Sequence, residues 1–401
     1  MNRIHFLSTG VSDSFIIESN GHYGLIDSSF PDDNIIRENV NTVINYLNQY
    51  KIKTLDFIIA THSHSDHIGG MPMIANSGFV THNTVYYYRP YTGTNEDEAH
   101  PEWENSKYCQ KAVNSMKAKK AKLIDVNDQK IKIHFNDFFI ELFNTESKPI
   151  QPFENNNSIG ALISHGKTKI FMASDIESTF SNKISSQIGK VDILKANHHG
   201  NSGLSFSYLK TLQPKYVVVP NKEIGSHFSP VAAYLRSINC KIFCTGQKKD
   251  SIILKVNENG YEFENINVSE SYEEHGNGFY KWEKDWFYLD NGNFVKGWYK
   301  INWSQGTNWF YFDENGAMLT GWHQLDWSQG KDWFYFDEHG AMVTGLRQLD
   351  WSQGKDWFYF DEHGAMQTGT IKIELDGIEN VLVLDDKNGN MIKRYQEVQT
   401  T

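Results

Sequence analysis

The chain has 401 residues, which is too long for one ordinary hydrophobic core, so we expect two domains. Its net charge of −11 disfavours a general nucleic-acid binder, and its aromatic content of 14% needs a structural explanation. The three cysteines lack zinc-ribbon spacing, which disfavours both a disulfide framework and a cysteine metal site.

The first two thirds of the chain mix strand and helix patterns. Met1 runs directly into a strand pattern and leaves no room for a signal peptide, so we expect that an export signal was removed or that export uses another route. The predicted strands, in chain order, are 4–8, 15–18, 23–27, 57–60, a hairpin over 131–143, a hairpin over 159–173, 191–196, 216–219, 241–244 and a hairpin turning at 257–260. The predicted helices are 31–50, 103–119, 178–188 and 231–237. This order predicts an αββα sandwich, two sheets packed face to face with helices outside.

A histidine-rich run follows the predicted strand 57–60. His62 and His64 alternate and can hold one cation, whereas Asp66 and His67, one step further on, can hold a second. Three imidazoles and one carboxylate within six residues suit Zn²⁺. The run therefore predicts a metal site at the end of this strand.

Three other strand ends carry polar residues that a sandwich would gather at one edge. Asp175 closes an apolar strand, where a carboxylate needs a cation or hydrogen-bond donors. His198 and His199 close another, and because neighbouring residues of a strand point in opposite directions, we expect only one of them to be a ligand. Residues 154–158, which are rich in asparagine, precede a third strand and read equally well as a turn.

Together these residues resemble the metallo-β-lactamase superfamily over roughly residues 3–265. Within it, they are similar to a group that contains choline-binding phosphorylcholine esterases of Gram-positive cell surfaces and the hydrolase domains of competence proteins. The resemblance implies two Zn²⁺ ions, or Mn²⁺ in their place. It assigns metal one to His62 and His64, metal two to Asp66, His67 and His199, and the bridge to Asp175. Asp175 would also orient the attacking hydroxide.

The pattern departs from the superfamily at residues 154–158, where many members supply a third histidine to metal one. Glu154, Asn155 or a water would have to take that place. Asp27 is a candidate for steering the ligand imidazoles. His227 matches a histidine of the competence group and is a candidate catalytic residue, together with Asp66 and Asp175, although a helix-entry residue without a role is the alternative.

The last third of the chain is an internal repeat. A Trp-Phe-Tyr triplet recurs at positions 286, 309, 333 and 357, each followed by a turn and a closing glycine. Each repeat predicts one hairpin, and the hairpins must stack into a solenoid because one alone cannot bury its aromatic face. Residues 381–390 keep the turn without the aromatics, as expected of a terminal cap.

Only part of this aromatic set is needed for a core, because alternation sends Phe310 and Phe312 to one side and Trp309 to the other. Facing aromatic walls form a cage for a quaternary ammonium group. The repeats resemble the choline-binding, or cell-wall-binding, modules of Gram-positive surface proteins over roughly residues 280–370. Leu346 and Thr370 replace tryptophan, so we expect weak or absent cages there. The resemblance assigns choline binding to Trp298, Trp309, Tyr311, Trp322, Trp333, Tyr335 and Trp357, and leaves Trp303, Trp327 and Trp351 open between cage and packing.

The sequence thus predicts an α+β chain with a hydrolase domain at 1–268, a linker at 269–279 and an all-β repeat module at 280–401. The leading hypothesis is a secreted, cell-wall-associated two-metal phosphodiesterase that releases phosphorylcholine from teichoic or lipoteichoic acid, with no membrane span. A competence-type nuclease is the alternative, which His227 favours and the negative charge disfavours. A non-catalytic choline-binding adhesin is a third hypothesis.

Overall fold

The computed structural model describes residues 1–33, 38–146, 152–221, 225–247, 251–266, 276–375 and 377–396. It divides into two compact units, Met1–Gly276 and Asn277–Thr401. Residues 269–275 of the predicted linker lie outside the described residues, and the predicted domain limits stay a prediction. Among the described helices, none has the length and hydropathy needed to cross a membrane.

The first unit is built on two sheets. The first sheet has eight strands in the order β15-β14-β1-β2-β3-β4-β5-β6, and the second has seven in the order β13-β12-β11-β10-β9-β8-β7. The strands of the first sheet are β1 (Asn2–Phe6), β2 (Phe15–Ser19), β3 (His22–Ile26), β4 (Phe57–Ile59), β5 (Val85–Tyr88), β6 (Lys122–Asp125), β14 (Ile252–Asn257) and β15 (Gly260–Phe263). Those of the second are β7 (Lys132–Phe135), β8 (Phe138–Phe143), β9 (Gly160–His165), β10 (Thr168–Met172), β11 (Ile193–Lys195), β12 (Tyr216–Val219) and β13 (Lys241–Cys244).

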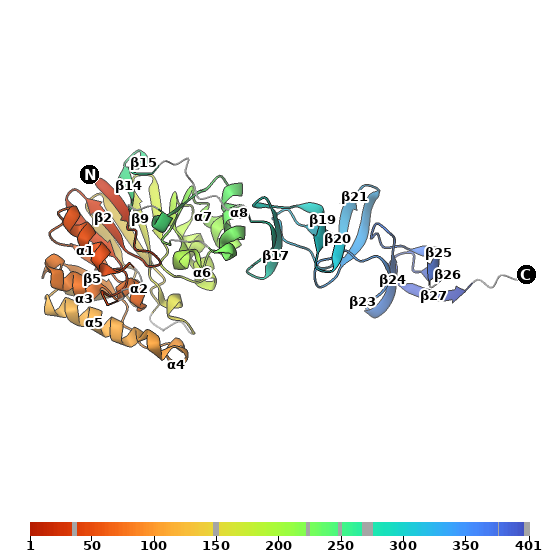
Figure 1. Cartoon of the computed structure of the whole chain (residues 1–401), viewed down its shortest axis with the longest axis horizontal. Helices are drawn as coiled ribbons and strands as arrows, with labels where there is room; N and C mark the ends of the chain where they lie inside the picture. Colours follow the sequence, from red (N-terminus) through yellow and green to blue (C-terminus); the bar gives the residue numbers. More distant parts are fainter. Residues whose placement is uncertain are drawn as a thin grey trace, which may run out of the picture. The chain divides into compact units, whose positions relative to one another are not determined.

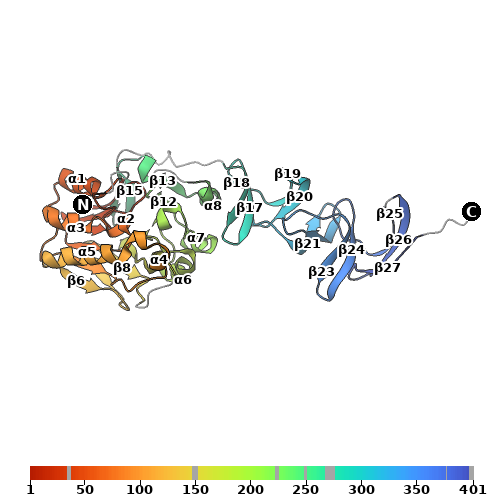
Figure 2. The ribbon, with the colours of Figure 1, turned by 60° about the horizontal axis from the view of Figure 1, so that its bottom comes forward.

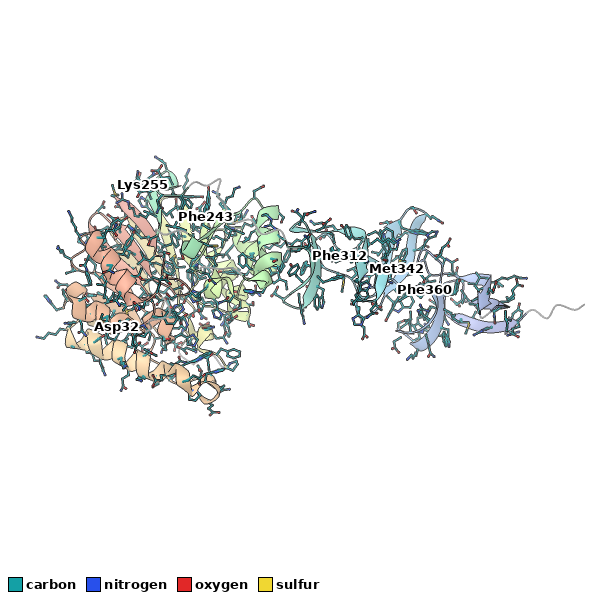
Figure 3. All side chains as sticks on the ribbon, in the orientation of Figure 1. Asp32, Phe243, Lys255, Phe312, Met342 and Phe360 are labelled. Carbon is teal, nitrogen blue, oxygen red and sulfur yellow. The ribbon has the colours of Figure 1, made fainter. Side chains whose placement is uncertain are left out.

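Helices cover the outer faces of both sheets (Figures 1 and 2). They are α1 (Val40–Gln49), α2 (Ser65–Ile68), α3 (Met71–Ile74), α4 (Glu96–Ala99), α5 (Asn105–Ala118), α6 (Ser178–Ile188), α7 (Phe206–Leu212) and α8 (Ser229–Ser237). One core lies between the sheets and includes Phe6, Phe138 and Phe243, the last labelled in Figure 3. A second core packs the first sheet against α1, α3 and α5 through residues such as Val43 and Met116. The predicted αββα sandwich is therefore confirmed.

The parallel strands of each sheet bring the predicted polar strand ends together. In the first sheet β3, β4, β5 and β6 pair in parallel, and in the second β10, β11, β12 and β13 do so. The carboxyl ends of parallel strands meet at one edge of a sheet, so the loops after β4, β10 and β11 converge. These loops carry the histidine run, Asp175 and the pair His198-His199.

The second unit is a series of antiparallel hairpins, which confirms the hairpin-repeat architecture. The strands are β16 (Gly278–Trp282), β17 (Asp285–Asp290), β18 (Asn293–Phe294), β19 (Gly297–Trp303), β20 (Gly306–Phe312), β21 (Gly321–Trp327), β22 (Gly330–Phe336), β23 (Gly345–Trp351), β24 (Gly354–Phe360), β25 (Gly369–Leu375), β26 (Ile378–Leu384) and β27 (Met391–Gln396). β27 adds a third strand to the last hairpin, directly after residues 381–390, which were predicted to be a cap.

Backbone hydrogen bonds and buried phenylalanines link each hairpin to the next. The amide of Met342 donates to the carbonyl of Trp309 over 2.8 Å, and the amide of Met366 donates to that of Trp333 over the same distance. Phe312 is fully buried, as is Phe360. Figure 3 labels Phe312, Met342 and Phe360 among these hairpins. Stacking therefore supplies the core that a single hairpin lacks.

Candidate functional site

The predicted ligands of metal two meet in a buried cluster. Asp66 and His67 lie in α2, directly after the loop that follows β4, whereas Asp175 and His199 come from loops of the second sheet. Asp175 Oδ2 lies 3.2 Å from His67 Nε2 and 3.4 Å from His199 Nε2. Asp66 Oδ2 lies 3.2 Å from His199 Nε2. One potential ligand atom from each of the four residues falls within 4.8 Å of the others.

The donor chemistry of this cluster fits a divalent cation. Two imidazoles and two carboxylates are a ligand set that Zn²⁺ accepts. His67 Nε2 and Asp175 Oδ1 are buried, and neither makes a hydrogen bond of acceptable geometry in the described part of the chain. Because buried polar atoms are nearly always paired, these two atoms point to a missing partner.

His62 and His64, the predicted ligands of metal one, face each other. His62 Nε2 lies 3.1 Å from His64 Nδ1. A tetrahedral zinc ion with zinc–nitrogen bonds of about 2.0 Å separates two nitrogen ligands by roughly 3.3 Å, so this spacing suits a shared cation. The other ring nitrogen of His64, Nε2, lies 2.8 Å from Glu96 Oε2, a pairing that orients the ring.

Glu154 and Asn155, the predicted candidates for the third ligand of metal one, differ in whether a side-chain oxygen lacks a hydrogen-bond partner. Both carboxylate oxygens of Glu154 are engaged, because Oε1 accepts from the backbone N–H of Ser63 and Oε2 from Asn157 Nδ2, each over 3.0 Å. Glu154 therefore holds the histidine loop in place. Asn155 Oδ1 is buried and has no hydrogen-bond partner among the described residues. Of the two oxygens predicted from the sequence, that of Asn155 is the one left free.

Asp27 fixes the orientation of His67. Its Oδ2 lies 2.8 Å from His67 Nδ1, and Thr61 donates to the same carboxylate from its backbone N–H over 2.9 Å and from its hydroxyl over 2.7 Å. An Nδ1–H that donates to Asp27 leaves Nε2 as the lone-pair side of the ring, facing Asp175. The structure thus places Asp27 behind a predicted ligand.

Asp13 and Lys195 belong to the same buried network, and neither was predicted from the sequence. Asp13 Oδ1 lies 3.2 Å from His199 Nδ1, and its other oxygen pairs with the Lys195 ammonium. Lys195 Nζ also lies 3.5 Å from Asp175 Oδ1 and donates to the carbonyl of Ser174 over 2.9 Å. Lys195 offered a signal, since it is a charged residue in an otherwise apolar strand. Asp13 and Glu96 lie in polar segments with no distinguishing pattern.

The electrostatics of the cluster favour positive charge. Burial opposes the charged form of His67, but the carboxylates of Asp175, Asp66 and Asp27 outweigh it and raise the His67 pKa well above its ordinary value. Burial also opposes the charged form of His199, but the carboxylates of Asp175 and Asp13 outweigh it and raise the His199 pKa well above its ordinary value. Protons on these rings thus balance the carboxylates, and a bound cation would displace them.

His62 behaves oppositely, since burial and the positive charges of His67 and His64 lower its pKa well below the ordinary value. A neutral His62 is the form that can bind a metal ion.

His198 and His227 are not part of the cluster. Both His198 and His199 have left-handed backbone, with φ of 43° and 54°, so they lie in a turn and strand alternation does not separate them as expected. His198 turns toward Glu177 Oε1 at 3.0 Å and Ser202 Oγ at 2.7 Å. Its Nε2 lies 3.8 Å from Asp175 Oδ2, at the edge of the cluster. His227 is exposed in the turn Ser226–Phe228, and none of the described contacts of the cluster includes it.

The second unit holds two aromatic cavities, each of about 300 Å³. The first, named here the Trp298 cavity, is lined by Trp298, Trp309, Trp327, Ser328, Phe334, Met342, Glu362 and His363. The second, the Trp322 cavity, is lined by Trp322, Trp333, Trp351, Ser352, Phe358, Met366, Lys387 and Asn388. Trp327 and Trp351, which the sequence left unassigned, are therefore cavity walls.

The other predicted cage residues lie outside these two linings. Tyr311 packs edge-on against Trp298 with ring centroids 5.2 Å apart, and Tyr335 packs against Trp322 at 5.1 Å, so each buttresses a wall. Trp357 is exposed on β24 and lines neither cavity. Trp303 packs against Phe310 with centroids 5.7 Å apart.

The family model for the metallo-beta-lactamase superfamily matches residues 7–126, which include α2 and the histidine loop. The first unit has the metallo-beta-lactamase fold. Its members are hydrolases, and the buried histidine and aspartate cluster lies in this metallo-beta-lactamase unit. No curated protein sequence matches the chain.

Several solved structures are similar to the chain. The metallo-beta-lactamase fold protein YhfI from Bacillus subtilis is 13% identical, with 63% of this chain and 99% of YhfI covered and a TM-score of 0.40. A diphosphatase from the PhnP family is 14% identical, with coverages of 64% and 98% and a TM-score of 0.40. CbpJ from Streptococcus pneumoniae TIGR4 is 24% identical, with 40% of this chain and 56% of CbpJ covered and a TM-score of 0.16. The chain thus spans about half the length of CbpJ, 56%.

Proposed function

We propose that the protein is a two-metal phosphodiesterase that hydrolyses phosphorylcholine esters on choline-decorated teichoic or lipoteichoic acid. In this proposal it is secreted and held at the cell wall by its aromatic cavities. The observation that carries the catalytic part is the buried convergence of Asp66, His67, Asp175 and His199, with His62 and His64 beside them. Zinc is the proposed metal, with manganese as the alternative, because the ligands are imidazoles and carboxylates.

Two divalent cations bound here would lower the pKa of a shared water and neutralise the oxygens of a phosphodiester. The chain's own residues prepare the site for this. Asp27 holds His67 in the tautomer that leaves Nε2 free, and Asp13 contacts the Nδ1 side of His199 in the same way. Lys195, fully buried, offsets part of the negative charge of Asp13 and Asp175. In the proposal Asp175 faces both imidazoles and orients the attacking oxygen.

The choice of phosphorylcholine rests first on the aromatic cavities. Each has three tryptophan walls, and aromatic faces attract a quaternary ammonium group through cation–π interaction. The indole N–H of Trp322 donates to the carbonyl of Asp350 over 2.9 Å, which holds that wall in a fixed orientation. A preformed cavity of this kind binds choline without first ordering its walls.

A second argument comes from Trp103 beside the candidate metal centre. Its ring lies edge-on to His64 with centroids 5.5 Å apart, it is stacked on His100 at 4.3 Å, and it is 41% exposed. By contrast, Tyr86 is buried and stacked with Tyr88, so these two tyrosines serve packing. We propose that Trp103 contacts the trimethylammonium end of the substrate.

The test compares a chromogenic phosphorylcholine diester with a plain chromogenic phosphodiester, each with and without chelator. We expect metal-dependent turnover that prefers the choline ester. Turnover that survives complete metal removal, verified by metal analysis, contradicts the metal-dependent mechanism. Cleavage of DNA with no turnover of the choline ester selects the nuclease alternative, and choline binding with no turnover of any diester selects the adhesin.

A further inference from the structure

The two aromatic cavities are built from equivalent residues 24 positions apart. The matching pairs are Trp298 and Trp322, Trp309 and Trp333, Trp327 and Trp351, Ser328 and Ser352, Phe334 and Phe358, and Met342 and Met366. At the rim, His363 and Lys387 are also 24 positions apart but differ in side chain, whereas Glu362 and Asn388 have no counterpart in the other lining. The Trp298 cavity has Glu362 and His363 at its rim, whereas the Trp322 cavity has Lys387 and Asn388. The two cavities have the same wall residue types, but the charged rim residue is the acidic Glu362 in one and the basic Lys387 in the other.

Built turns hold these rim residues in place. Asp361 Oδ1 accepts the backbone N–H of His363 over 2.9 Å, which fixes the turn that carries Glu362. Asp385 Oδ1 accepts the backbone N–H groups of Lys387 over 2.9 Å and of Asn388 over 2.7 Å. The two charged side chains are exposed, yet their backbone positions beside the cavities are set by equivalent aspartates.

We infer that the two cavities differ in ligand selectivity, so that the Trp298 cavity prefers a bare quaternary ammonium and the Trp322 cavity one that carries a phosphate. In the Trp298 cavity the Glu362 carboxylate attracts a cation and repels an attached phosphate. In the Trp322 cavity the Lys387 ammonium repels a bare cation, and a neighbouring phosphate reverses that effect by pairing with it. This inference rests on the proposed function, since it takes quaternary ammonium groups as the ligands of both cavities.

With this selectivity, the two cavities would bind different choline-containing groups of the cell wall. The Trp322 cavity would hold phosphorylcholine groups with the phosphate attached, which are substrate or released product. The Trp298 cavity would hold quaternary ammonium groups that carry no phosphate, such as free choline. Exposed charge pairs are weak, so we expect each rim charge to change the ratio of the two dissociation constants by about two- to five-fold.

The experiment separates the cavities in the full chain with variants of their exposed walls. Trp309 and Trp333 are each 41% exposed. Trp309→Ala removes a wall of the Trp298 cavity, so only the Trp322 cavity stays intact. Trp333→Ala removes a wall of the Trp322 cavity, so only the Trp298 cavity stays intact. Choline and phosphorylcholine are titrated into each variant by tryptophan fluorescence. Ten of the 11 tryptophans lie in the second unit, so the signal reports mainly on the cavities. The rim of the intact cavity is then changed in each background. Lys387→Gln is added to Trp309→Ala, and Glu362→Gln is added to Trp333→Ala.

We expect Trp309→Ala to bind phosphorylcholine relatively more tightly than Trp333→Ala does. Lys387→Gln should lower the preference for phosphorylcholine, Glu362→Gln should lower the preference for choline, and both changes should fade at high salt. Equal ratios in the two backgrounds, or ratios that do not respond to the rim variants, overturn the inference and leave the proposed choline anchoring intact. Failure of the unmodified chain to bind either ligand overturns the anchoring part of the proposed function together with the inference. Metal-dependent turnover of the chromogenic diester is measured separately and is unaffected by either result.

Discussion

At the scale of single residues, the candidate metal centre depends on side chains behind the ligands. Asp27 accepts three hydrogen bonds, two from Thr61 and one from His67, and it does so fully buried. Asp13 has the corresponding position behind His199, where Lys195 compensates its charge. The geometry of the ligand rings is therefore set before any cation arrives, which is what a high-affinity site needs.

Asp27→Asn should weaken metal binding about 10- to 100-fold, because an amide cannot hold the Nδ1–H of His67 as a carboxylate does. Metal affinity is measured by competition with a chromogenic chelator, and diester turnover should fall in parallel. Asp56→Asn is the matched control, since Asp56 pairs with His22 on the surface with Oδ1 and Nδ1 3.1 Å apart. Unchanged metal affinity in Asp27→Asn would show that Asp27 does not position His67.

Trp103→Ala should raise the KM for the phosphorylcholine diester and leave the KM for the plain diester unchanged. The reason is that the exposed Trp103 ring beside His64 offers a cation–π surface, worth a few-fold to about 30-fold in binding. Steady-state kinetics on the two substrates measure the difference, and Trp103→Phe should retain part of the preference. An equal change for both substrates would assign Trp103 to packing around the loop.

The sequence could name the ligand cluster because its residues follow apolar strands. The histidine run, Asp175 and the histidine pair all come directly after buried strands, and the topology of parallel strands brings such positions to one edge. Asp13 was not predicted because it lies in a loop, and Glu96 was not predicted because it begins the short helix α4; a lone carboxylate is ordinary in both places. Lys195 was detectable in principle, since burial of an ammonium in a strand requires partners.

At the scale of elements, alternation along the repeat strands separates packing from binding. On β22 the ring of Phe334 is fully buried, whereas its neighbour Trp333 is 41% exposed. The same contrast occurs on β20 between Phe310 and Trp309. One face of each hairpin thus makes the core, where Phe334 also reaches the Trp298 cavity, and the other face contributes the exposed tryptophan walls.

Phe334→Ala should lower the stability of the second unit by about 3–5 kcal/mol, because it leaves a cavity in the stacked core. Trp333→Ala, one residue away on the other face, should change stability little and weaken choline binding instead. Thermal unfolding with choline titration measures both effects. Equal destabilisation by the two variants would contradict the division of faces.

Some elements could not be predicted from local pattern. Strands β5 and β6 were not predicted, because the three tyrosines of β5 do not alternate in polarity and β6 begins with a lysine. Helix α1 begins at Val40, although the pattern suggested a start near residue 31, and residues 34–37 lie outside the described part. Asn39 caps α1 by accepting from the backbone N–H of Asn41, a signal that was available in the sequence. Hairpins were easier, since their turns have distinctive residues.

At the scale of the whole molecule, the candidate metal centre and the aromatic cavities belong to different units. The candidate metal ligands all lie in Met1–Gly276, and both aromatic cavities lie in Asn277–Thr401. Two units with separate cores allow each activity to be removed without the other.

Free choline in excess should therefore block hydrolysis of choline-decorated walls and leave turnover of the small chromogenic diester nearly unchanged. Under the proposed function, it would occupy the cavities that retain the protein at the wall, without ligating the metals. The two assays are run on the same full chain, with excess sodium chloride of equal ionic strength as the control. Equal inhibition of both substrates would mean that choline acts at the catalytic site.

Each aromatic cavity is built from several consecutive hairpins. The Trp298 cavity takes its walls from the hairpins β19–β20 and β21–β22 and its rim from the turn after β24, so three consecutive hairpins build one cavity. The Trp322 cavity uses the next triplet, and neighbouring cavities share two hairpins. A further copy of the 24-residue unit that keeps these wall residues would therefore be expected to add one cavity. Because avidity rises steeply with valency, the loss of one cavity, whether through deletion of a unit or through substitution of a wall tryptophan, would strongly weaken retention on a surface that carries many ligands.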